Sequence, residues 1–224
     1  MSNELSVFTP AVLPGTLIDA TSDVFRSLTT AGDFLDRIQL FTKGQFVDNG
    51  AIGPGHYGVP SGETVLDLGK EIDIFPLDCR AKALDIRDKD AIVVSYDPES
   101  PLFKEIQILA KERDSHCMCG PTFLVFERST AKFYELFAGV NKSMLREAPK
   151  IGACLQKNPV TLKTQYVKKK SYSWWAPVCV ACSTPFANTP TQEEVLKQIK
   201  KFRDLKSSEV EVVAEAPATS KRAR

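Results

Sequence analysis

Residues 166–175 combine basic and aromatic side chains within one short segment. The segment reads Tyr-Val-Lys-Lys-Lys-Ser-Tyr-Ser-Trp-Trp and contains both tryptophans of the chain. Ammonium groups can follow the phosphates of a nucleic acid while aromatic rings stack on unpaired bases, at roughly 1–3 kcal/mol for each stacked base. These residue types therefore favour the binding of a single strand. The simpler alternative is one tryptophan in the core, a second that is covered, and a solvated lysine turn.

The charge around this segment is strongly one-sided. Between positions 148 and 192 the chain has six lysines and no Asp or Glu, although the formal net charge of all 224 residues is only +1. The place of the charge matters more to a polyanionic partner than the total does. The stretch therefore favours nucleic acid as the partner.

Two other segments add candidate residues. A hairpin expected around 128–134 is basic and aromatic, and a glycine-rich loop at 43–62 carries a lysine and two aromatic rings. Taken alone, the first segment is explained better by an ordinary hairpin with one buried ring, and the second equally well by a loop whose Phe46 and Tyr57 plug one end of the barrel. The candidate nucleic-acid-binding residues are Lys43, Phe46, Tyr57, Arg128, Lys132, Tyr134, Lys163, Tyr166, Lys168, Lys169, Lys170, Tyr172 and Trp175.

The two tryptophans should have different fates, because successive side chains of a strand point to opposite faces. One face of the expected strand is almost wholly apolar and the other is mixed; they carry Tyr172, Trp174, Ala176, Val178 and Val180, and Ser173, Trp175, Pro177 and Cys179. We expect Trp174 to be mostly buried and Trp175 to be exposed toward DNA. A bulge near Pro177 would invert this assignment.

Cysteine spacing raises the question of a metal. Cys179 and Cys182, and Cys117 and Cys119 beside His116, are spaced like zinc ligands. Cys179 and Cys182 fall in an expected strand, however, where their side chains would point to opposite faces. We expect reduced thiols, no metal and no cofactor.

Motifs of catalysis give little support for an enzyme. The P-loop, the GxSxG nucleophile elbow and HExxH do not occur, and the chain has two histidines. A metal-dependent nuclease that uses the acidic residues of 63–99 is a weaker alternative, since no carboxylate pair there has a His or Lys at motif spacing. We expect no enzymatic activity.

The pattern along the chain favours a mainly β fold. Strands are expected at 64–68, 70–77, 91–96, 122–127, 132–137, 160–166 and 172–182, helices near 30–41, from 101 and near 192–202, and a loop at 139–159. No regular βαβ alternation appears, so we expect an OB-fold-like antiparallel barrel with two or three helices. The expected domains are an N-terminal arm with a possible helix (1–42), a nucleic-acid-binding domain (43–206) and a disordered tail (207–224).

Several segments resemble the single-stranded DNA-binding proteins of tailed bacteriophages. They are 55–60, 95–100, 120–127, and 172–177 through 182–186, within a similarity that spans about 40–205. The resemblance implies an oligonucleotide-binding fold, sequence-independent binding in replication or recombination, and no catalytic residues. Many such proteins end in an acidic tail that recruits replication enzymes, whereas this chain ends Ser-Lys-Arg-Ala-Arg, which puts that recruitment in doubt.

We therefore expect a protein that binds and protects single-stranded DNA, with replication or recombination proteins as further partners. The long apolar runs needed for a membrane helix and the apolar stretch of a secretory signal are missing, so we expect the cytoplasm of an infected bacterial host. The alternative is a virion or assembly protein that binds other protein chains.

Overall fold

The computed structural model describes residues 35–61, 63–87, 92–112, 115–186 and 189–205. Most of the expected N-terminal arm and the whole expected tail therefore lie outside the described residues.

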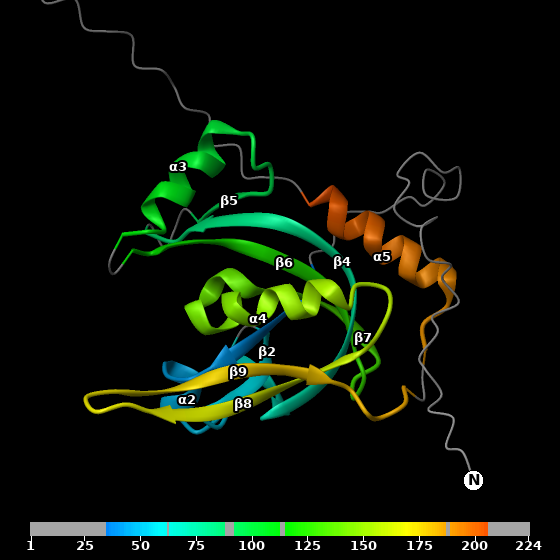
Figure 1. Ribbon diagram of the computed structural model, residues 1–224, viewed down its shortest axis with the longest axis horizontal. Helices are drawn as coiled ribbons and strands as arrows, with labels where there is room; N and C mark the ends of the chain where they lie inside the picture. Colours follow the sequence, from blue (N-terminus) through cyan, green and yellow to red (C-terminus); the bar gives the residue numbers. More distant parts are fainter. Residues whose placement is uncertain (1–34, 62, 88–91, 113–114, 187–188, 206–224) are drawn as a thin grey trace, which may run out of the picture.

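A curved, mainly antiparallel sheet of nine strands forms the body (Figure 1). Its path runs β3-β2-β1-β7-β6-β4-β8-β9, with β5 paired to β4, and among the described pairings only β1 with β7 is parallel. The strands are β1 (Arg37–Phe41), β2 (His56–Ser61), β3 (Thr64–Gly69), β4 (Glu71–Asp85), β5 (Val93–Ser95), β6 (Cys117–Glu127), β7 (Lys132–Phe137), β8 (Val160–Lys168) and β9 (Ser173–Ala181).

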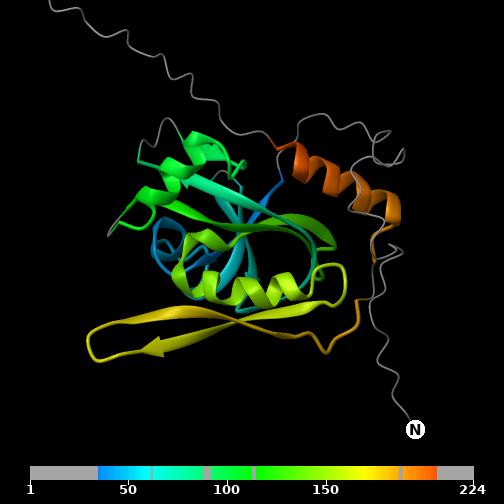
Figure 2. The same cartoon turned by 45° about the horizontal axis from the view of Figure 1, so that its top comes forward.

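The expectation of a mainly β fold is confirmed, but the expectation of a barrel is wrong. The path of paired strands has two ends, β3 and β9, so the described sheet is not closed. The physical reason lies in the last two strands. Instead of returning to β3, β8 and β9 continue outward as a long hairpin (Figures 1 and 2).

Four α-helices accompany the sheet in the described ranges, where two or three were expected. They are α2 (Gln45–Asp48), α3 (Pro101–Leu109), α4 (Lys142–Ala153) and α5 (Gln192–Asp204), with a 3₁₀ turn at Ala138–Val140. Caps explain two of the helices that the sequence predicts, α3 and α5. Ser100 accepts a hydrogen bond from the Phe103 N–H, and Thr191 and Glu194 form a reciprocal capping box.

Helix α4 occupies a segment where we expected a loop. Pro149 lies inside it and Gly152 near its end, and both residues mask the helical pattern. The pattern is nevertheless present, because Met144, Ala148 and Ile151 recur at spacings of four and three and are all buried. The Asn141 side chain begins the helix by accepting a hydrogen bond from the Met144 N–H.

Two further segments differ from expectation. Residues 37–41, expected as the end of a helix, form β1, whose Ile38 enters the core between β2 and β7. The glycine-rich stretch expected as a loop contains the short helix α2 and strand β2. Both strands are stabilised by distant partners that local spacing does not reveal.

The core has a layer on each side of the sheet. One layer lies beneath α4 and includes Ile72, Phe123 and Leu162. The other lies beneath α5 and includes Phe75, Phe126 and Phe202. Both helices therefore cover the central strands and leave the outer part of β8 and β9 uncovered, as the views in Figures 1 and 2 agree.

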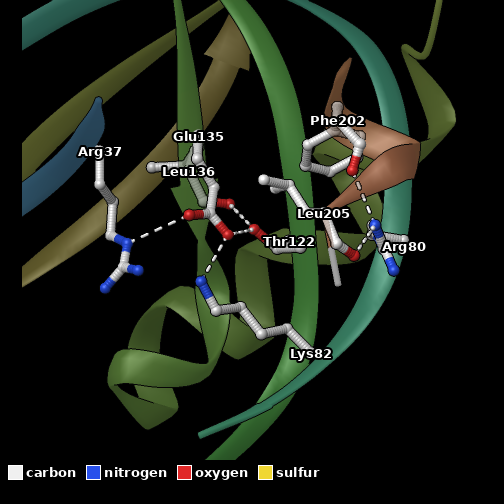
Figure 3. Close-up of polar contacts among 8 residues, drawn as sticks. All are labelled: Arg37, Arg80, Lys82, Thr122, Glu135, Leu136, Phe202 and Leu205. Atoms are coloured by element: carbon white, nitrogen blue, oxygen red, sulfur yellow. Dashed lines mark hydrogen bonds and ion pairs between the residues drawn. The ribbon is translucent and has the colours of Figure 1, made fainter. Parts of the chain in front are cut away.

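A polar cluster joins the strands on the α5 side (Figure 3). The Lys82 ammonium contacts Glu135 Oε1 at 2.6 Å, Thr122 Oγ1 donates to the same oxygen at 2.8 Å, and Arg37 Nε reaches Oε2 at 3.3 Å. Nearby, Arg80 Nη1 donates to the backbone carbonyls of Phe202, Arg203 and Leu205. Arg80 thereby satisfies carbonyls at the end of α5 and holds the helix on the sheet.

Candidate nucleic-acid interface

The basic and aromatic segment folds as the β8–β9 hairpin and projects from the body (Figure 2). Tyr166 is the register partner of Trp175, and Lys168 that of Ser173. The apex is closed by a hydrogen bond from the Lys169 N–H to the Tyr172 carbonyl at 2.8 Å. This hairpin, expected from the alternation at 160–166 and the lysine turn, places every candidate of the segment close to one apex.

One face of the hairpin, the Trp175 face, carries Tyr166, Lys168 and Trp175. The Tyr166 and Trp175 rings lie 5.1 Å apart, and the Tyr166 hydroxyl donates to Ser173 Oγ at 2.7 Å. The Lys70 ammonium lies 4.5 Å from the centre of the Trp175 ring, a cation–π contact. The indole is therefore held on this face by neighbours, whereas Tyr166 is 53% exposed.

The opposite face, the Trp174 face, carries Tyr172, Trp174 and Lys169. The Tyr172 and Trp174 rings stack with centres 5.3 Å apart and an angle of 22° between their planes. Lys169 lies 5.7 Å from the Trp174 ring, and Tyr172 is 59% exposed. A nearly parallel pair with an open outer ring offers a flat surface on which a base can stack.

The expected assignment of the two tryptophans is wrong. Both are half-buried, and the core side of the strand is the Trp175 face, which it shares with the buried Pro177 and Cys179. Among the described residues, the face with Ala176, Val178 and Val180 is apolar but only partly covered: Ala176 and Val178 are half-buried, and Val180 is 37% exposed. The reason is the position of α4, which packs on the Trp175 side of the strand. The Cys179 N–H donates a hydrogen bond to the Glu147 side chain of this helix.

The three lysines of the apex are exposed and stand apart from carboxylates. None of Lys168, Lys169 and Lys170 belongs to an ion pair within the described part of the chain. Lys163, in contrast, pairs with Glu71 at 3.0 Å, and Arg128 pairs with Asp73 at 2.7 Å. The positive charge that is free to meet phosphates therefore lies at the apex rather than at the base of the hairpin.

Arg128 and Lys132 lie away from that apex. Asp73, the partner of Arg128, also accepts a hydrogen bond from Thr161, at the base of β8. Thr161 and Lys168 are seven residues apart, which corresponds to about 23 Å along a strand. Lys132 is exposed in a groove beside α5. The structure does not bring these two residues together with the hairpin apex.

Two candidate tyrosines are buried and cannot stack on a base, so their expected role is wrong. Tyr57 is 0% exposed in the core beneath α4, where burial raises the pKa of its hydroxyl. Tyr134 is 2% exposed, and its hydroxyl donates to Thr130 Oγ1 at 3.1 Å. Each lies at an inward position of its strand, next to other core residues.

Phe46 and Lys43 lie in and beside α2. The Phe46 ring packs edge-on against Phe41 with 5.9 Å between ring centres, so it is half-buried, which agrees better with the plugging alternative. Lys43 is exposed in the turn before the helix.

Lys70 and Gly55 are neighbours of the hairpin that we did not predict. Lys70 follows Gly69 between two strands, and nothing local indicates its contact with Trp175. Residues 53–58 do match the GxGxxG pattern of dinucleotide-binding proteins, which needs a preceding strand and a following helix. Here the pattern leads into β2, and Gly55 lies against Trp175, so it packs the hairpin rather than binding a phosphate.

The cysteines form no metal centre in the described ranges. All six fall there, none is in a disulfide, and no group of three or more potential ligands is present among these residues. Burial raises the pKa of the Cys179 thiol to about 11.

The comparisons with known proteins are negative. No protein-family model matches the chain, and neither a curated protein nor a solved structure is significantly similar to it. Within the described residues, every helix is too short or too polar to span a membrane.

Proposed function

We propose that the chain binds single-stranded DNA without sequence preference through the apex of the β8–β9 hairpin. The observation that carries the proposal is the combination of two exposed tyrosines, Tyr166 and Tyr172, with three exposed lysines on one projecting hairpin. Stacking tolerates any base because every base has a π-face, and the lysines attract the backbone. Neither interaction reads sequence.

The tryptophans support the tyrosines in this account. Trp174 and Trp175 each pack against a tyrosine, at 5.3 Å and 5.1 Å between ring centres. Such packing limits the motion of the outer ring and lowers the entropy that binding must remove. The tyrosines are therefore the rings that meet bases, and the tryptophans are their supports.

The biological setting that we propose is phage DNA replication or recombination in the cytoplasm of an infected bacterium, with proteins of those processes as further partners. This setting rests on the resemblance of the sequence alone. We also propose that the sheet is an open variant of the oligonucleotide-binding fold. It differs from a closed barrel in that β3 and β9 do not pair.

A protein-binding role in a virion or assembly is the second candidate. The partly exposed apolar surface of Ala176, Val178 and Val180 favours it, because such a surface also suits another protein chain. Salt distinguishes the two, since nucleic-acid affinity falls steeply with salt and an apolar protein interface does not weaken in that way.

Replacing both exposed tyrosines tests the proposal. We expect Tyr166→Ala combined with Tyr172→Ala to weaken oligonucleotide binding by about 1–3 kcal/mol for each stacked base lost. The matched control is the Phe pair at the same positions, which keeps both rings and should bind nearly as tightly as the unchanged protein. Fluorescence anisotropy gives the affinity, and thermal melting shows that both variants fold. An Ala pair that binds like the Phe pair would refute stacking at this hairpin.

A further inference from the structure

The hairpin carries its two aromatic pairs on opposite faces. Because Tyr166 and Trp175 are register partners, and Trp174 pairs with Val167, the two tryptophans alternate across the ribbon. Tyr172 stacks on Trp174 and therefore shares its face. Each face thus ends in one exposed tyrosine supported by one tryptophan.

Each face also has its own positive charge. Lys169 lies over Trp174, and Lys70 lies over Trp175. Lys168, the register partner of Ser173, belongs to the Trp175 face, and Lys170 is exposed in the turn at the apex. A single strand is bound by aromatic rings that stack on its bases and by ammonium groups that attract its phosphates. Each face of the hairpin offers both kinds of group.

A two-stranded ribbon is one backbone layer thick, and side chains on its two faces point in opposite directions. One strand could reach both tyrosines only by turning around the apex. Two strands that diverge from an opening duplex pass naturally on either side of a projecting ribbon. We propose, on the basis of the function proposed above, that the hairpin binds a DNA fork, with one single-stranded arm on each face and the apex lysines toward the duplex.

The test compares three DNA probes on the full chain by fluorescence anisotropy: a single strand, a blunt duplex, and a fork whose two unpaired arms together equal the single strand in length. Binding of the second arm becomes intramolecular once the first is bound, so we expect the fork to bind at least about tenfold more tightly than the single strand.

Single substitutions then show whether both faces contribute. We expect Tyr166→Ala and Tyr172→Ala each to lower the affinity for the fork to about the affinity for a single unpaired arm. Each should weaken single-strand binding by no more than about twofold, because the other face remains. Tyr166→Phe and Tyr172→Phe are the controls and should keep the preference for the fork.

The outcomes separate this inference from the proposed function. A single strand that binds as tightly as the fork, or a fork that depends on only one tyrosine, overturns fork binding and leaves single-strand binding in place. Absence of binding to every unpaired DNA overturns both.

Discussion

Glu135 and Lys82 form an ion pair inside the molecule, with the Lys82 side chain only 1% exposed. Burial disfavours the ionised carboxylate, but Lys82 and Arg37 outweigh it and hold the pKa of Glu135 below its usual value. Removing one partner of such a pair leaves a buried charge uncompensated, which typically costs about 3–5 kcal/mol. Removing either Glu135 or Lys82 should therefore cost more than removing one partner of an exposed pair.

This pair predicts a pH dependence of stability. A lowered pKa in the folded state stabilises above the ordinary pKa of about 4.3, and that contribution disappears as the pH falls through the folded value. We expect Glu135→Gln to lower the free energy of unfolding by about 3–5 kcal/mol near neutral pH. The difference should shrink in acid, as the pH falls below about 4.3 toward the lowered pKa of Glu135 in the folded protein.

Urea unfolding of both proteins at about pH 7 and about pH 3 measures this difference. Glu193→Gln serves as the control, because Glu193 is exposed in the first turn of α5 and is not the capping-box residue. A difference for Glu135→Gln that persists in acid would contradict the role of its charge.

At the residue scale, the sequence predicted chemistry better than orientation. The lysines and aromatic rings of 166–175 do lie together at an exposed apex. The assignment of Trp174 as buried and Trp175 as exposed was wrong because an apolar face need not be a covered face; both side chains are half-buried. The side of the strand that is covered depends on the position of α4, and the sequence predicted a loop rather than a helix for that segment.

At the scale of elements, the β8–β9 hairpin must be stabilised by contacts with the rest of the sheet, because an isolated two-stranded hairpin is only marginally stable. Thr164 Oγ1 donates to the Gly55 carbonyl at 2.7 Å, and the Gly55 N–H donates to the Phe41 carbonyl at 2.7 Å. A Cβ on Gly55 would lie 2.3 Å from Cδ2 of Trp175. Gly55 thus allows the backbone to approach the indole and connects the hairpin to β1.

Gly55→Ala should loosen this attachment. The φ of Gly55 is +83°, which costs an L-residue about 1–2 kcal/mol, and the clash with Trp175 adds about 1–3 kcal/mol. Gly50→Ala is the matched control, because Gly50 has φ +75° and nothing within 4 Å of the added Cβ. Limited trypsin digestion at Lys168–Lys170 and urea unfolding report the effect. Equal sensitivity of the two variants would show that the Gly55–Trp175 contact does not hold the hairpin.

The free edge of β9 is protected along part of its length. Pro177 has no N–H to offer, and the Cys179 N–H is already bonded to Glu147 Oε2 at 2.9 Å. Lys150 holds that carboxylate at 2.7 Å. These features disfavour pairing of another strand with β9 at 177–179.

Elements with strong local signals were predicted correctly. The hairpins β6–β7 and β8–β9, and the capped helices α3 and α5, all follow from alternation or capping residues. Strand β1 and helix α4 were missed. Five residues of β1 depend on partners in β2 and β7, and Pro149 and Gly152 disguise the amphipathic pattern of α4.

For the whole molecule, composition and alternation predicted a mainly β fold but not its topology. Strand β4 runs for 15 residues and pairs with β5, β6 and β8, with an irregularity between Pro76 and Asp78. Local patterns indicated only its first half. Whether a sheet closes depends on such long-range pairings, so the barrel could not be distinguished from the open sheet in advance.

The most direct test of single-strand binding is its salt dependence. Each phosphate neutralised on a single strand changes the slope of log affinity against log salt by about −0.7. We expect the unchanged protein to bind an oligonucleotide at low salt with a steep slope. Replacing Lys168, Lys169 and Lys170 by Gln should flatten that slope by about 2.

The matched control replaces three exposed lysines outside the hairpin, Lys104, Lys111 and Lys142, by Gln, which changes the net charge equally. Its slope should stay close to that of the unchanged protein. The account predicts that only the apex variant loses affinity and slope together. Failure to bind the oligonucleotide at low salt, or equal slopes for the two triple variants, would contradict it.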